Sequence, residues 1–402
     1  MDEEERHRAQ EERHRAHLRA WWSHRQGLDG SLIGAAPADV LARTGWARSV
    51  GGSGPYLGLR ARCGASREEV DGAVARLDIH ELPSARGCAY VLPAVDFALG
   101  LTVGAHAPEA EARQAAKHLG VTSGELDDLC AAVHDALGDV PLDPARIKAA
   151  TGGAVRALGP EGKKRGLGTT LPLALGLLQA RGRIRRVPVS GRLDQQRYGY
   201  VVWDLDLGDR TPETARAELA RRYFDWAAPA SLAHFRWFSG LTAAAAKAAV
   251  AGLGLVDVGD GLLMPPGLLD DFEAFTAPAD PSYALLAGVD GIHLLHRDFG
   301  RIVEPADAEG EFGGKRLGGL ADAPAHMIVD RGRLVGLWEY DVGAEVVVWR
   351  VFGGGRRGKG DAALRAAVAA TEAFVRDELG DARSFSLDSP RSREPRVAEL
   401  RD

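Results

Sequence analysis

Three stretches of this chain repeat one order of predicted elements, in which helices are followed by two short strands around a turn. The strand pairs lie in residues 79–93, 184–204 and 254–266, and each follows segments with helical periodicity. Helices that end in a β-hairpin are typical of winged helices, and a recurring unit indicates a tandem array. The repeat therefore predicts three consecutive winged-helix units.

The chain after the third hairpin has a different pattern. Residues 283–305, 326–340 and 345–352 are predicted strands, and an Ala-rich helix is predicted over 362–379. The predicted fold class is α+β and mostly helical, with three tandem winged-helix units and a β-rich C-terminal domain. The expected boundaries are 1–110 for an N-terminal helix and the first unit, 111–208 and 209–278 for the second and third units, and 279–402 for the last domain.

Two tempting ligand sites are weak. His7, His14, His17 and His24 lie among arginines on one predicted helix, without the spacing of a zinc site, so a solvated helix with an apolar edge at its C-terminal end is the better interpretation. The glycines of the 49–59 segment do not follow the G-x-G-x-x-G order of a dinucleotide loop. No metal and no nucleotide cofactor is expected.

The cysteine pattern and the N-terminus bear on location. The three cysteines are scattered and form no C-x-x-C pair, which favours a reducing cytoplasm. The N-terminal segment has no apolar signal region, and no stretch approaches the length of a membrane span. A cytoplasmic protein without a membrane partner is expected.

Residues 163–197 carry nine Lys or Arg and one acid, in a chain of net charge -6. A local basic stripe on an acidic chain indicates a chosen surface for a polyanion, and therefore DNA. The second predicted hairpin and the helix from Thr169, with its free N–H groups, belong to this stripe. The predicted DNA-binding residues are Lys163, Lys164, Arg165, Thr169, Thr170, Arg181, Arg183, Arg185, Arg186, Arg192, Gln195, Gln196 and Arg197. Ordinary solubilising charge stays an alternative, and the basic residues of the Gly-rich run 353–361 are open in the same way.

Several segments together resemble the AlkZ/YcaQ-type winged-helix DNA glycosylases, which remove alkylated bases and open interstrand crosslinks. The resemblance covers almost the whole chain and depends on RQGLDG, PYLGLRAR, LPSARGCAYVLPAVDF, PASLAHFRWFSGLTAAAAKAAV, AGVDGIHLLHRD and MIVDRGRLVGLWEY. It implies three tandem winged helices and a β-rich domain, bent into a C that straddles duplex DNA. It also implies a role in DNA repair, with self-resistance to a genotoxic metabolite as one setting.

Active members of the family carry a Gln, an apolar residue and then Gln or Asp shortly before the PYLGL-like segment, where the motif positions water at the sugar. The resemblance places Arg48, Ser49 and Val50 on this motif, and none of the three matches it. Val50 cannot orient a water, and Arg48 would repel the positive charge that develops as a glycosidic bond breaks.

Three interpretations stay open for the chemistry. The chain uses another carboxylate, with Glu68, Glu69, Asp71 and Glu81 nearest in sequence. Alternatively, it depends on the positive charge of the alkylated base, which is already a good leaving group. In the third interpretation it binds DNA or senses lesions without catalysis. Tandem units in one chain remove the need for a dimer, so a monomer is expected.

Overall fold

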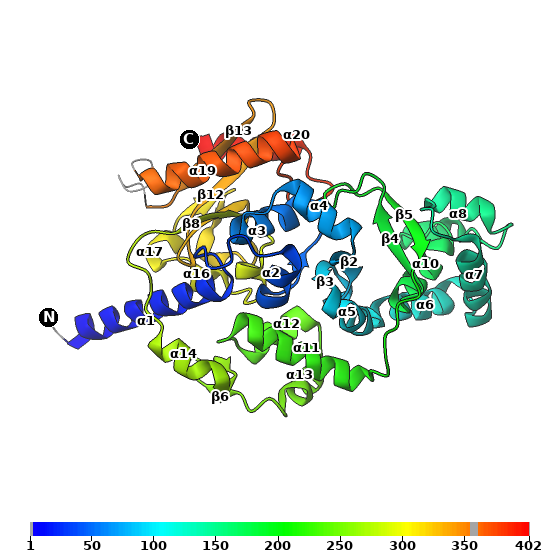
Figure 1. Cartoon of the computed structure of the whole chain (residues 1–402), viewed down its shortest axis with the longest axis horizontal. Helices are drawn as coiled ribbons and strands as arrows, with labels where there is room; N and C mark the ends of the chain where they lie inside the picture. Colours follow the sequence, from blue (N-terminus) through cyan, green and yellow to red (C-terminus); the bar gives the residue numbers. More distant parts are fainter. Residues whose placement is uncertain (1–2, 354–360, 402) are drawn as a thin grey trace.

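The computed structural model describes residues 3–353 and 361–401, so the central part of the Gly-rich run 353–361 lies outside the described residues. Helix α1 (Glu3–Arg25) leads the chain, with its first half exposed and its last turns buried (Figure 1). Trp21 and Trp22 anchor it, because their indole N–H groups donate to the carbonyls of Ala228 (2.9 Å) and Pro229 (3.1 Å). The predicted apolar edge of this helix is confirmed as its buried end.

The first repeat contains the predicted hairpin and one additional strand. Its elements are α2 (Pro37–Thr44), β1 (Ala47–Arg48), α3 (Gly54–Cys63), α4 (Arg67–Ala75), β2 (Ile79–Pro83) and β3 (Ala89–Pro93). The strands form an antiparallel sheet in the order β1-β3-β2, in which Arg48 pairs with Tyr90. Helix α4 begins at a capping box made by Ser66 and Glu69. PYLGL lies in α3.

The second repeat is the most helical and lies at the opposite end of the molecule from the start of α1 (Figure 1). Helix α5 (Phe97–Gly104) packs on the first hairpin and leads into this repeat. The elements of the repeat are α6 (His106–Leu119), α7 (Ser123–Ala136), α8 (Pro144–Ala150), α9 (Gly159–Lys164), α10 (Leu171–Ala180), β4 (Ile184–Pro188) and β5 (Tyr198–Val202). The predicted helices and hairpin are present. Helices α5, α6 and α9 were not predicted.

The third repeat matches its prediction closely. Its elements are α11 (Pro212–Ala227), α12 (Leu232–Ser239), α13 (Ala243–Val250), β6 (Val256–Asp257), β7 (Leu263–Met264) and α14 (Leu269–Ala274). Ser231 and Thr242 cap α12 and α13 by accepting from backbone N–H groups three residues later.

The last part of the chain is a four-stranded antiparallel sheet with helices on it. Its elements are β8 (Tyr283–Leu286), α15 (Gly291–Leu294), α16 (Phe299–Ile302), α17 (Pro305–Ala308), β9 (Glu311–Phe312), β10 (Lys315–Arg316), β11 (His326–Asp330), β12 (Arg333–Asp341), β13 (Val346–Val351), α19 (Ala362–Phe374), a π-helical turn (Val375–Leu379) and α20 (Pro390–Arg401). The sheet order is β13-β12-β11-β8. The expectation of strand over all of 283–305 is wrong after Leu286, because Asp290 caps a short helix at this point.

The hydrophobic cores join parts that are distant in sequence. One core combines residues of α2, α3 and α4 with the C-terminal sheet, including Leu57 and Trp338. A second core packs the first hairpin against α5, α11 and α12. The β1 strand therefore lies where the first repeat, the third repeat and the C-terminal domain meet.

One apolar residue of the second hairpin's turn, Leu193, is buried in the first core. Leu193 is 0% exposed, and its backbone N–H donates to the Tyr56 hydroxyl at 2.9 Å. Gln196 packs so tightly on Gly51 that a Cβ at this glycine would overlap it. The tip of this hairpin is therefore docked on the first repeat, because its apolar residue Leu193 packs in that core.

Candidate active site and DNA interface

The segment at Arg48, Ser49 and Val50 is extended and half-covered. The Arg48 guanidinium donates to the carbonyl of Ala89 at 2.7 Å and stacks over Tyr90, 5.3 Å from the ring centroid. Ser49 is buried, and its backbone N–H also donates to Ala89 (3.0 Å). The Arg48 cation is therefore held in place by its own sheet.

Below this segment, Ser49 meets a buried carboxylate. The Ser49 hydroxyl donates to Glu81 Oε1 at 2.5 Å, and Arg186 of the second hairpin approaches Oε2 at 3.1 Å. Arg186 also lies over the Tyr198 ring, 4.5 Å from its centroid. The Glu81 side chain is 3% exposed, so it requires the arginine to compensate its charge. This Glu81 network joins the β1 strand to the second repeat.

The other three carboxylates have local structural tasks. Glu68 is exposed on the first turn of α4. Glu69 accepts from the backbone N–H of Ser66 at 2.7 Å, and this bond lowers the pKa of its carboxyl. Asp71 accepts from the Tyr56 hydroxyl at 2.5 Å and from Arg67. Of the four carboxylates, Glu81 is the one that hydrogen-bonds to the 48–50 segment.

A small cavity of about 30 Å³ lies beside Arg48 and Trp46. Its polar wall is a buried ion pair in which Arg62 holds Asp290 through two bonds of 2.7 and 2.8 Å. Gln26, from the RQGLDG segment, accepts from Arg62 at 3.1 Å. A cavity of this size accommodates one or two water molecules, and its lining offers both donors and acceptors.

The chain segment 383–388 is hydrogen-bonded to the Gly-rich turn that follows Val50. Ser53 N–H donates to the carbonyl of Arg383 at 2.9 Å, and Ser386 N–H donates to the carbonyl of Val50 at 3.1 Å. A Cβ at Gly52 would overlap the Arg383 carbonyl, so this glycine is required for the close approach. The C-terminal domain thus reaches the candidate site directly.

A cationic stack lies at the turn of the first hairpin. The guanidiniums of Arg86 and Arg297 lie over the Trp237 ring, 4.2 and 4.4 Å from its centroid. Both arginines have left-handed backbone φ values, 58° and 40°, which non-glycine residues seldom adopt. Arg86 is exposed, while Arg297 also binds Asp322 at 2.7 Å. Sequence reasoning missed this stack because its members come from three separate segments.

The predicted DNA-binding residues differ in exposure and in whether they form ion pairs within the chain. Arg181, Arg183, Arg186 and Arg192 form ion pairs with acids of the same chain, and Arg185 is half-buried, with its pKa lowered by desolvation. Thr170 is buried and accepts from the N–H of Arg156, while Thr169 and Gln195 are half-buried. Exposed members are Lys163, Lys164, Arg165, Arg181, Arg183, Gln196 and Arg197, although Lys164 also pairs with Glu161.

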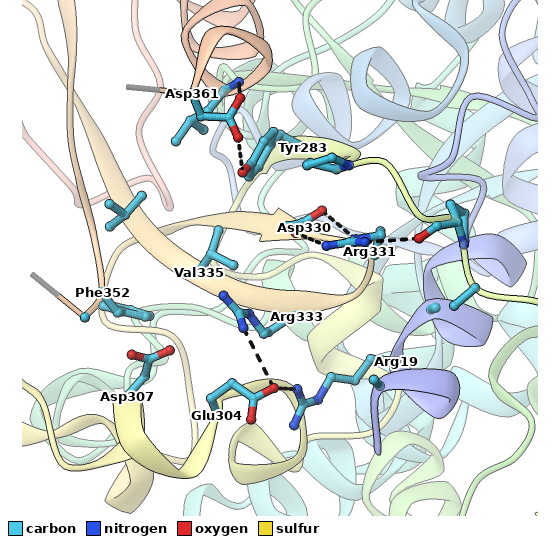
Figure 2. A pocket seen from close by; sticks show the side chains of 18 of the residues that line it. Arg19, Tyr283, Glu304, Asp307, Asp330, Arg331, Arg333, Val335, Phe352 and Asp361 are labelled. Carbon is cyan, nitrogen blue, oxygen red and sulfur yellow. Dashed lines mark hydrogen bonds and ion pairs between the residues drawn. The ribbon is translucent and has the colours of Figure 1, made fainter. Parts of the chain in front are cut away.

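A larger cavity of about 1310 Å³ lies between α1 and the C-terminal sheet, as Figure 2 shows. Its charges are largely paired with one another: Arg19 with Glu304, Arg331 with Asp330, and the Tyr283 hydroxyl with Asp361. The described residues that line it include none of the predicted site residues.

Within residues 3–353 and 361–401, no cluster of three His, Cys, Asp or Glu side chains has the arrangement of a metal site. Over the same described ranges, no helix is both long and apolar enough to cross a membrane.

Comparison with known proteins finds one matching family and a similar solved structure. The family described as DNA glycosylase AlkZ-like matches residues 51–385. Among solved structures, the Streptomyces sahachiroi DNA glycosylase AlkZ is similar, with a TM-score of 0.69 and 19% sequence identity. The similarity covers 92% of this chain and 98% of that one. No protein of curated function matches the chain.

Proposed function

Because the chain belongs to the AlkZ-like family of DNA glycosylases, we propose that it excises alkylated bases from duplex DNA. We also infer that its three helix–hairpin repeats are winged-helix units, which together form a C-shaped monomer around the duplex. The observation that carries the proposed chemistry is the 48–50 segment. It presents a fixed guanidinium at Arg48, and its neighbouring carboxylate, Glu81, is buried below it.

This arrangement suits a cationic leaving group. In an N7-alkylated guanine the C1′–N9 bond breaks, and its electron pair neutralises the positive charge of the base. The base leaves as a neutral molecule and needs no proton. Water then adds to C1′ of the sugar cation and loses a proton to solvent, which leaves an abasic site. Substrates are therefore limited to cationic lesions.

The chain's residues have positioning roles in this scheme. The Glu81 network, with Ser49 and Arg186, holds the β1 strand in place. Arg48 contacts a phosphate next to the damaged nucleotide, where its charge is favourable, and does not face the sugar cation. The small cavity beside Arg48 holds water near the strand.

The DNA path crosses the Arg86–Trp237–Arg297 stack. Replacing Arg86 by Gln keeps the side-chain stem on Trp237 but removes one exposed charge. The slope of log K against log salt is expected to fall by about one, at about 0.9 per phosphate contact. Fluorescence anisotropy with a labelled duplex at several salt concentrations measures this slope. Arg316→Gln, at an exposed site 67% accessible, is the control and should leave the slope unchanged.

One observation favours a second function, a lesion sensor without catalysis. Neither Arg48 nor Val50 can activate water, and the Ser49 hydroxyl already donates its hydrogen bond to Glu81. Incubating the purified chain with methylated duplex and measuring free 7-methylguanine by chromatography separates the two functions. Base release supports the glycosylase, whereas tight binding to the lesion without release supports the sensor.

A further inference from the structure

Two large apolar side chains project from the 383–388 turn, which is hydrogen-bonded to the candidate site. Phe385 is 45% exposed and Leu387 is 84% exposed. The other large exposed apolar side chains of the described residues, Ile33, Val95, Val140 and Val189, are isolated from one another in sequence. Single exposed apolar residues are ordinary, but a pair on one turn beside a functional segment requires an explanation.

The turn is held rigidly from two sides. On one side, Ser386 N–H donates to the carbonyl of Val50 at 3.1 Å. On the other, Asp388 is buried, accepts from Ser384 N–H at 3.2 Å, and is held by Arg396 through two bonds of 3.0 Å. Asp388 N–H closes the turn on the carbonyl of Phe385 at 3.0 Å. The backbone that carries Phe385 and Leu387 is therefore fixed by hydrogen bonds on both sides.

The charges around the pair fit DNA better than a protein partner. Arg197 is exposed on the second hairpin, whose neighbouring Gln196 packs on Gly51, and Arg391 is exposed at the start of α20. Exposed apolar side chains on a surface that also carries exposed arginines match a base stack with its phosphate backbones. An apolar wedge that enters the stack compensates for the unstacking of a nucleotide moved out of the duplex.

We propose that Phe385 and Leu387 form a wedge that enters the duplex next to the damaged nucleotide and fills the space left when this nucleotide flips out. The inference rests on the proposed function and adds the residues that open the duplex. The wedge reaches the lesion because its turn is bonded to Val50, at the end of the 48–50 segment. It has no task on a single strand, where the base is already unstacked.

The test compares duplex with single-stranded DNA. Phe385→Ala/Leu387→Ala should slow single-turnover release of 7-methylguanine from a duplex about tenfold or more. Release from the same strand without its complement should be unchanged. Val95→Ala/Val140→Ala removes exposed apolar surface elsewhere and should affect neither rate. Equal rates for the wedge variant and the wild type on duplex would overturn the wedge and leave the glycosylase intact.

A second measurement keeps the wedge testable if no base is released. 2-Aminopurine placed next to the lesion becomes fluorescent when it unstacks, and saturating wild-type protein should increase its emission. The wedge variant should bind the duplex without this increase. An increase equal to that of the wild type would refute the wedge, whatever the catalytic result. Loss of self-association in the variant, with unchanged DNA behaviour, would assign the pair to a protein contact instead.

Discussion

Lowering the pH from about 6.5 towards 4 is expected to reduce the free energy of unfolding steeply, because buried histidines are neutral in the fold. Burial is the main reason that the pKa of His80 is lowered to about 3, that of His293 to about 4 and that of His296 to about 3. The unfolded chain takes up these protons below its ordinary histidine pKa of about 6.5.

The sign follows from where the protons bind. Above pH 6.5 neither state is protonated at these histidines, and their contribution to stability is complete. As the pH falls from 6.5 towards the folded values, the unfolded state binds more protons and stability is lost. Each histidine contributes a slope of about 1.4 kcal/mol per pH unit, or about 4 for the three together.

Urea unfolding at pH 7, 6 and 5 measures this slope. His80→Phe removes one of the three groups, so its stability should fall less steeply with pH than that of the wild type, whatever its absolute value. His118→Gln, at an exposed position of α6, is the matched control and should keep the full slope. If His80→Phe kept the wild-type slope, His80 would not be a buried neutral group.

Asp290→Asn is expected to cost about 3–5 kcal/mol of unfolding free energy, because it leaves the Arg62 guanidinium buried without its counter-ion. Both side chains are nearly inaccessible, at 6% for Arg62 and 4% for Asp290. Asn keeps the acceptor that caps α15 at Ile292 N–H, so the loss reports mainly on the charge. The pair links α3 to the start of α15 beside the small cavity.

Chemical denaturation of matched variants tests this estimate. Glu309→Gln breaks the exposed Arg316–Glu309 pair and should cost less than 1 kcal/mol. Replacing Arg62 by Met and Asp290 by Leu together should recover part of the loss, because no unpaired charge remains. A cost for Asp290→Asn as small as that of the exposed control would show that water reaches the Arg62 guanidinium.

The repeated helices and hairpins could be predicted from the sequence because each has a local signal. Capping residues such as Ser66 and Ser231 mark helix starts, and alternating apolar residues mark the strands. The family was predicted from the resemblance of six sequence segments, and it is confirmed by the match over residues 51–385. Strand β1 was missed because its partner β3 is distant in sequence, so no hairpin turn marks these two residues.

The site could be predicted only in part, because its contacts cross long stretches of chain. The single apolar residue of the SGRLDQQR turn, Leu193, enters a core whose partner Tyr56 is 137 residues away. Glu81 was among the candidate carboxylates, but its pairing with Arg186 could not be predicted because it depends on the docking of two repeats. Tertiary packing, which local patterns do not encode, decides which charges stay free.

Release of a base from two matched duplexes tests the central claim most directly. The duplexes are identical except that one carries 7-methylguanine and the other uracil, and single-turnover release is measured with the wild-type chain. We expect release of the cationic base and none of uracil, because the 48–50 segment supplies no group to stabilise a neutral base as it leaves. Comparable release of uracil would contradict this chemistry, and release of neither base from a bound duplex would assign the protein to lesion sensing.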